Sequence, residues 1–226
     1  MILTLSIPLI AVVIGALIAA FTTKNSVKFK QLLLSFSGSF LLSITLIELI
    51  PEVLAAHTDQ KTASLFILFG ILLQIILEGF SKGAEHGHSH GSEAKGIKGI
   101  ALILIALFIH AFIEGVPLEG RTHLLWAVAL HKIPIGMILF SLTQKAGLDK
   151  SGSYLTVILF GLVTPLGSRA GELAYIVRYL PYLNAISAGI FLHVGAIILF
   201  ESEKGHRFNL SKIMVVILGI ALAYLL

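Results

Sequence analysis

The sequence contains no cysteine, and only 12% of its 226 residues are charged. The absence of cysteine excludes a disulfide framework and any thiolate metal site, so a bound metal would need imidazole and oxygen ligands. A soluble domain normally carries about 25% charged residues, so the low charged fraction argues against a soluble protein. Hydrophobic residues make up 57% of the chain and gather in long blocks, which leaves no room for a soluble domain beside them. The low charged fraction and the long hydrophobic blocks together predict an integral membrane protein with a single transmembrane domain, residues 1–226.

Apolar blocks between charged or turn-rich breaks predict eight membrane-spanning helices, since one span needs about 20 mainly apolar residues. The expected spans are residues 2–22, 31–55, 62–81, 97–117, 122–144, 153–177, 182–201 and 210–226. Pro165, Arg169 and Glu172 interrupt the sixth block and the last block is short, so seven spans are the alternative. The expected fold class is all-α, a polytopic bundle of eight transmembrane helices.

Basic residues are divided unevenly between the two sides that alternating loops define. Eleven of the 16 lysines and arginines fall on one side and three on the other, while Lys132 and Arg169 fall inside spans. Because positively charged loops stay in the cytoplasm, both termini are expected to face outward. These loop charges also explain the net charge of +4, so nucleic acid is not an expected partner. From its compact size alone, we expect a multi-pass protein of the cell (plasma) membrane.

The longest connection, residues 82–96, is rich in glycine, serine and histidine. Its three histidines, His86, His88 and His90, alternate with small residues. Short His-rich tracts bind metal ions, so this segment is predicted to be a flexible cytoplasmic loop that captures metal. The alternative is a solvated polar linker.

Ionisable side chains inside the predicted spans form the main candidate site, because such residues are costly in a membrane and usually functional. His110 and Glu114, in HAFIEG, are four residues apart and share one helix face. Zinc accepts imidazole and carboxylate together. With the expected orientation, His110, His131 and Glu48 all lie roughly 10–14 Å below the outer surface. We therefore predict a metal site of His110, Glu114 and His131, with Glu48 as a candidate fourth ligand; a simple His–Glu hydrogen bond and a structural polar network are the alternatives.

Three more polar residues occur in the second and third expected spans. They are Glu52, which follows Pro51, and Gln74 and Glu78. They are predicted to be accessory groups along a metal pathway.

The segments HAFIEG and ALHKIPIG resemble the paired fourth- and fifth-helix signatures of the ZIP metal transporters, H-x-x-x-E-G and H-E-x-P-H-E. ELIPE, GLVTPLGSRAGE and SAGIFLHVGAIILFE are similar to that family's second-, sixth- and seventh-helix segments. The resemblance implies an eight-helix bundle that holds metal between the fourth and fifth helices and moves zinc, iron, manganese and related ions into the cytoplasm. By position, His110 and Glu114 match the fourth-helix ligands, and His131 matches the first fifth-helix histidine.

The fifth-helix motif departs from the family pattern. Lys132 replaces its acid, and Ile135 and Gly136 replace its later His–Glu pair. Many family members hold two metals side by side. We predict that the Lys132 ammonium stands in for the second cation and neutralises Glu114 or Glu48, leaving a one-metal site. The alternative is that Lys132 abolishes ordinary transport.

The function expected from these observations is uptake of a divalent metal, zinc first, with Fe²⁺, Mn²⁺ or Co²⁺ also permitted by the ligand types. Zinc is then the transported ion, and no catalytic or cofactor-binding residue is assigned. An intramembrane zinc-dependent hydrolase is the alternative from another class, although H-E-x-x-H does not occur. The third candidate function is that of a transport-defective or specialised ZIP-like metal sensor. The expected partners are divalent ions, the lipid bilayer and a second copy of the chain in a homodimer.

Overall fold

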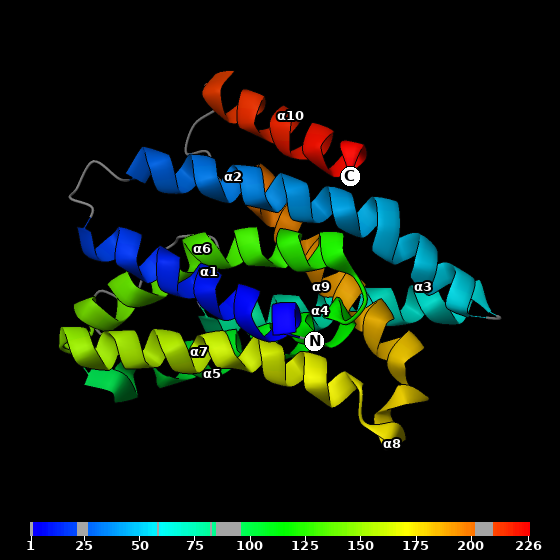
Figure 1. Ribbon diagram of the computed structural model, residues 1–226, viewed down its shortest axis with the longest axis horizontal. Helices are drawn as coiled ribbons and strands as arrows, with labels where there is room; N and C mark the ends of the chain where they lie inside the picture. The colour runs from blue at the N-terminus through cyan, green and yellow to red at the C-terminus, as the bar shows by residue number, and fades with distance from the viewer. Residues whose placement is uncertain (1, 22–26, 58, 82, 85–95, 202–209) are drawn as a thin grey trace.

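The computed structural model describes residues 2–21, 27–57, 59–81, 83–84, 96–201 and 210–226. Regular structure in these ranges is entirely helical, which confirms the expected all-α class. The helices are α1 (Ile2–Phe21), α2 (Val27–Ile44), η2 (Thr45–Leu49), α3 (Ile50–Ala56), α4 (Gln60–Ser81), α5 (Gly96–Gly115), η4 (Val116–Leu118), α6 (Thr122–Lys145), α7 (Lys150–Gly171), α8 (Ala174–Val177), α9 (Leu180–Glu201) and α10 (Leu210–Leu225). The long helices lie side by side in one elongated bundle (Figure 1).

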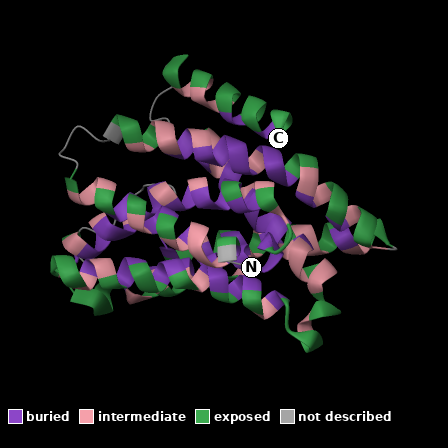
Figure 2. Ribbon diagram, in the orientation of Figure 1, coloured by how far each residue is buried: buried purple, intermediate pink, exposed green. Residues whose placement is uncertain are grey.

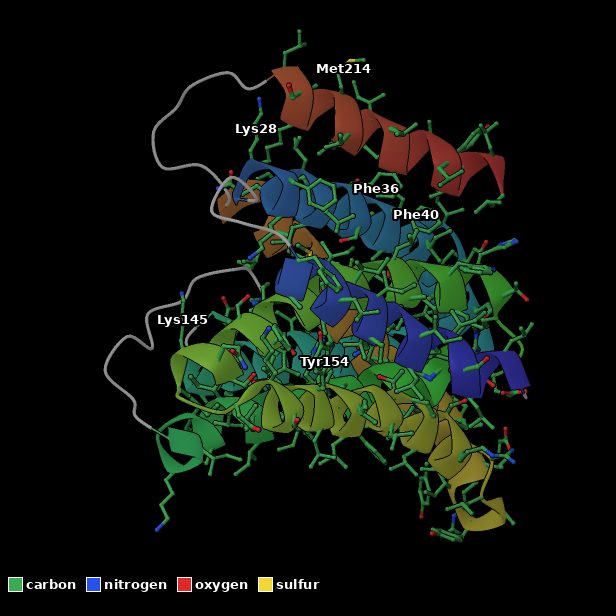
Figure 3. The ribbon with its side chains drawn as sticks, turned by 60° about the vertical axis from the view of Figure 1, so that its left-hand side comes forward. Lys28, Phe36, Phe40, Lys145, Tyr154 and Met214 are labelled. Carbon is green, nitrogen blue, oxygen red and sulfur yellow. The ribbon has the colours of Figure 1, made fainter. Side chains whose placement is uncertain are left out.

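Seven of the described helical segments are long and apolar enough to cross a membrane. The eighth expected span corresponds to α10, which has 16 residues. At 1.5 Å per residue it measures about 24 Å, less than the roughly 30 Å hydrocarbon core. α10 nevertheless lies along α2, with Phe36 and Phe40 of α2 close below it (Figures 1 and 3). Eight spans therefore remain a prediction, and so does the outward position of the termini.

The sixth expected span, residues 153–177, is longer than the helix that forms. α7 ends at Gly171, and the backbone N–H of Glu172 turns back to the carbonyls of Arg169 and Ala170. Leu173 is extended, and the separate short helix α8 follows it. The hydropathy pattern extended the span too far because the apolar residues of α8 continue the block without a break in composition.

The second span contains a π-helical turn, η2. Pro51 has no N–H and cannot donate to the carbonyl four residues earlier. The N–H of Ile50 donates instead to the carbonyl of Thr45, five residues back. Such turns insert one extra residue and often occur at functional sites. Here the turn includes Glu48 and sets the direction of its side chain.

Glycine lets three pairs of long helices approach backbone to backbone. A Cβ on any of the glycines concerned would collide with a carbonyl oxygen of the partner helix, so only glycine fits there. The contacts are Gly15 on Ile133 and Gly136 on Val12 (α1 with α6), Gly115 on Thr164 and Gly167 on Phe112 (α5 with α7), and Gly70 on Ile186 and Gly189 on Ile67 (α4 with α9). In contrast, α5 and α6 have little direct backbone contact with each other.

Buried residues concentrate on the helix faces that point into the bundle, and exposed residues cover its outside (Figure 2). Many exposed residues are large and apolar, including Leu65, Leu68 and Leu72 of α4. The interior contains several buried polar side chains, and Lys132 is among the largest fully buried residues. An apolar exterior around a partly polar interior suits a protein surrounded by lipid.

Candidate metal site

His110, Glu114 and His131 converge in the interior of the bundle. α5 supplies His110 and Glu114, and α6 supplies His131. All three side chains are buried, and each offers one ligand atom within 4.8 Å of the other two. His110 and Glu114 share a face because they are one helical turn apart, and the His110 Nε2 lies 3.7 Å from the Glu114 Oε2. This set of two imidazoles and one carboxylate is a donor set that zinc and similar ions accept.

The orientation of His110 is fixed from a third helix. Its Nδ1 lies 3.0 Å from the side-chain Oε1 of Gln74 on α4. An amide oxygen can only accept, so Nδ1 carries the hydrogen and donates it. The other ring nitrogen, Nε2, then keeps its lone pair toward Glu114 and can bind a metal. Partners of this kind fix the tautomer of metal-binding histidines.

Lys132 neutralises the carboxylate at the centre of the group. Its Nζ lies 2.5 Å from the Glu114 Oε2, and both side chains are fully buried. The ammonium also lies 4.7 Å from the centre of the Phe160 ring, a distance typical of a cation–π contact. The second oxygen, Oε1 of Glu114, is buried and has no hydrogen-bond partner among the described residues. One carboxylate oxygen is thus held by lysine, while the other remains available.

Glu48 and Glu52 have different partners and do not join this group. Oε1 of Glu48 lies 2.6 Å from Nδ1 of His123, and Oε2 of Glu52 lies 2.5 Å from Nε of Arg121. Both pairs are partly exposed and join the second span to the start of α6. The fifth expected span contains two histidines, His123 and His131. The sequence analysis assigned a role to His131 but none to His123. Of the two carboxylates considered as partners of Lys132, the structure places Glu114 beside it.

Glu78 also has a partner that sequence reasoning did not assign. Its Oε2 lies 2.6 Å from Nε2 of His193 on α9. His193 stands within the seventh expected span, residues 182–201, but nothing in the sequence pairs it with Glu78. The loop histidines His86, His88 and His90 lie outside the described residues.

The geometry of the central group is open enough to admit an ion. Two ligand atoms at about 2.0–2.1 Å from one tetrahedral zinc lie about 3.3 Å apart. The ligand atoms of the three residues are up to 4.8 Å apart, so they need to close by roughly 1.5 Å at most. Rotation of buried side chains can supply a movement of that size without rebuilding the helices.

Comparison with known proteins gives one family. The family model described as ZIP Zinc transporter matches residues 81–226, about two thirds of the chain. The matched segment includes the three residues of the central group, together with Lys132 and His193. No curated protein matches the chain.

Proposed function

The chain belongs to the ZIP zinc transporter family, and on that premise we propose that it takes up a divalent metal, zinc first, through the His110/Glu114/His131 group. The observation that supports the proposal is the convergence of these three buried residues from two helices. The plasma membrane, inward direction and homodimer expected from the sequence belong to the same proposal.

The transported ion binds as the substrate, to the His110 Nε2, one carboxylate oxygen of Glu114 and a ring nitrogen of His131. Gln74 prepares His110 by accepting the hydrogen of its Nδ1. Because Oε2 of Glu114 is held by Lys132, the oxygen offered to the metal is Oε1. Water completes the coordination and leaves when the ion moves on. A rigid-body movement of helices then opens the site toward the cytoplasm.

Lys132 makes this a site for one ion. Glu114 is the only carboxylate among the three residues of the central group, and the Lys132 ammonium already binds one of its oxygens. That oxygen is therefore not available as a ligand for a second metal ion. With neutral histidines, Glu114 and Lys132 have no net charge together, so an arriving dication meets no excess of negative charge. We expect moderate affinity, which favours release as well as binding.

The selectivity of the site follows from its ligands. Imidazole and carboxylate without sulfur accept Zn²⁺, Fe²⁺, Mn²⁺ and Co²⁺, and disfavour ions that require thiolate. Zinc is first because two nitrogen ligands and one oxygen ligand, with one open position, match its tetrahedral preference.

Ion flux into proteoliposomes tests the proposal. We expect wild-type protein to take up zinc, His110→Ala to lose uptake, and His57→Ala to retain it. His57 is a suitable control because it is not part of the central group. Its Nδ1 contacts the Val53 carbonyl of the preceding helix, α3, and its ring packs against the ring of Tyr182. Uptake by a folded His110→Ala variant at the wild-type rate would refute the proposed site.

Two other functions make different predictions in the same assay. A zinc-dependent hydrolase predicts bound zinc with no flux, and so does a metal sensor. The transporter proposal requires flux that saturates with zinc concentration.

A further inference from the structure

A pair of side chains with metal-binding chemistry links η2 to the start of α6, apart from the central group. Oε1 of Glu48 lies 2.6 Å from Nδ1 of His123, and the two side chains are 31% and 38% exposed. The residues of the central group are at most 3% exposed. A carboxylate oxygen and an imidazole nitrogen are both ligands that zinc accepts. The pair therefore offers the ligand types of the central group at a more accessible position.

His123 lies about two turns from the central group along α6. It precedes His131 by eight residues, a distance of about 12 Å along the helix axis. Ala127 stands halfway between them, and residues four apart share a helix face, so the three residues follow one side of α6. The pair lies toward the end of the bundle that carries α3, opposite the end that carries Lys145 (Figures 1 and 3). Because the lysine-rich end is expected in the cytoplasm, the pair lies on the expected outer side.

Apolar side chains lie between the pair and the central group. Leu49 and Leu124, which directly follow Glu48 and His123, are fully buried in a cluster that also contains Ala127. An ion that reaches the pair therefore meets packed apolar residues on its way inward, and it passes them only when the helices move. A site at this position holds an ion next to the closed passage until that movement occurs.

The irregular backbone of η2 directs Glu48 toward His123. Glu48 lies in the π-helical turn in which the Ile50 N–H donates to the Thr45 carbonyl. Turns of this kind are rare and often occur at functional sites. Here the turn places a carboxylate opposite an imidazole of another helix, which is an arrangement that a metal site requires.

Stabilisation of the bundle is a weaker explanation of the pair. Partly exposed ion pairs contribute about 0–1 kcal/mol to stability. The neighbouring pair of Glu52 and Arg121 already joins the second span to the residue before α6. Because the Glu48–His123 contact contributes little to stability, an arriving dication can replace it.

We propose that Glu48 and His123 form an outer metal-binding site, which captures a divalent ion before it enters the central group. This inference rests on the proposed transport function. The ion replaces the direct contact, so the two ligand atoms separate from 2.6 Å to about 3.3 Å for a tetrahedral ion. The single hydrogen of the neutral imidazole moves from Nδ1 to Nε2. Water fills the remaining coordination positions, because both side chains are partly exposed.

The charge of the outer site differs from that of the central group. In the central group, the Lys132 ammonium holds one oxygen of Glu114. Among the described residues, the polar contact of the Glu48 carboxylate is with His123 alone. With a neutral imidazole, the pair carries a net negative charge, and such a charge at an entrance raises the local concentration of cations. This difference favours capture at the outer site and release from the central group.

Quenching of tryptophan fluorescence by Co²⁺ tests the outer site in the purified full-length chain. Trp126 is the only tryptophan and follows His123 by three residues, about 4.5 Å along the axis of α6. In the His110→Ala/His131→Ala variant, which lacks two central ligands, we expect saturable quenching by Co²⁺ to remain. Adding Glu48→Gln or His123→Gln should abolish the saturable quenching.

A matched control comes from another partly exposed carboxylate. Glu172 follows the last residue of α7, is 35% exposed and is paired with Arg169. Adding Glu172→Gln to the same double variant should leave the quenching unchanged. Saturable quenching that persists after His123→Gln, or none in the double variant itself, overturns the outer site.

A second measurement uses the absence of cysteine and leaves the central group intact. In the Glu48→Cys/His123→Cys variant, we expect Cd²⁺ to protect both thiols from a maleimide reagent, because adjacent thiolates share one ion. The single variants serve as controls and should be protected much less. Equal labelling of the double variant with and without Cd²⁺ shows that these positions cannot hold an ion together and refutes the site.

Uptake measurements separate this inference from the proposed function. Glu48→Gln should raise the zinc concentration for half-maximal uptake about tenfold, with the maximal rate retained. Glu48→His should stay close to wild type, because imidazole is also a zinc ligand, whereas a purely structural ion pair would be lost in both variants. An unchanged half-maximal concentration in Glu48→Gln refutes the outer site and leaves the transport proposal intact. Absence of uptake by wild-type protein refutes transport, and with it the capture role.

Discussion

Replacing Lys132 with glutamine tests the charge arrangement of the central group most directly. In the wild type, the ammonium lies 2.5 Å from Oε2 of Glu114, and neither side chain is exposed beyond 1%. Glutamine keeps much of the side-chain length and removes the charge. Glu114 then stays in the interior as a carboxylate without a counter-ion. We expect the metal-free variant to be less stable than wild type and to bind zinc more tightly.

The loss of stability and the gain in zinc affinity should both be large enough to measure. Removing one partner of a buried ion pair typically costs about 3–5 kcal/mol. At about 2–4 °C per kcal/mol for a chain of this length, the metal-free melting temperature should fall by roughly 6–20 °C. A zinc ion on Glu114 would lie about 4.5 Å from Nζ, and their repulsion is then about 7 kcal/mol at an effective dielectric constant of 20. If relaxation leaves only a fifth of it, removing the lysine still tightens zinc binding about tenfold.

Thermal unfolding in detergent, with a chelator and with a zinc series, measures both effects together. The zinc-dependent rise in melting temperature should be larger for Lys132→Gln than for wild type, because zinc replaces the missing counter-ion. Lys150→Gln, a charge removal at the start of α7, should behave as wild type. The Glu114→Gln/Lys132→Gln variant should recover stability without gaining zinc affinity. An equal or smaller zinc response in Lys132→Gln would refute the role of lysine as a resident cation.

Three further predictions concern other parts of the structure. Gln74→Leu removes the acceptor that orients the α5 histidine, and zinc affinity should fall about 10–100-fold in a binding titration, with the fold unchanged. Gly136→Ala places a methyl against the α1 backbone and should cost about 1–3 kcal/mol in denaturant unfolding, whereas Gly79→Ala, with nothing within 4 Å of the new methyl, should not destabilise. The Thr62 hydroxyl and backbone N–H groups at the start of α4 donate to Asp59 and lower its pKa. The stability that Asp59 contributes is therefore present above its usual pKa and lost as the pH falls through the lowered value, so Asp59→Asn should flatten the acid side of a melting-temperature profile.

The sequence predicted the helical class, most helix positions and the residues of the central group. Long apolar blocks define spans because each must cover the hydrocarbon core, so their positions follow from composition. The four-residue spacing of His110 and Glu114 fixes their common face. His131 required a further assumption, that α5 and α6 are neighbours. The depth argument placed His131 at the level of His110, and the family resemblance implied that the two helices share the metal. Gln74 was also expected on the pathway, but its contact with His110 was not.

The pairs that form across helices were much harder to predict. Glu48 was expected near the central group because its depth matched, yet depth says nothing about rotation around the helix axis. The π-turn adds one residue before Pro51 and changes that rotation, and Glu48 contacts His123 instead. Likewise, Glu78 and His193 are 115 positions apart, and only the packing of α4 on α9 brings them together.

The sparse backbone contact between α5 and α6 has a mechanical consequence. Each of these helices packs closely on another partner through glycine, α6 on α1 and α5 on α7, and α7 in turn packs against α1 and α6. The direct link between α5 and α6 is made mainly by the polar residues between them. An ion held by His110, Glu114 and His131 therefore adds a direct link between α5 and α6, which are otherwise connected mainly through α1 and α7. A loaded protein should be stiffer than an empty one, and discharge of the ion loosens the same joint that must shift before the next ion can enter.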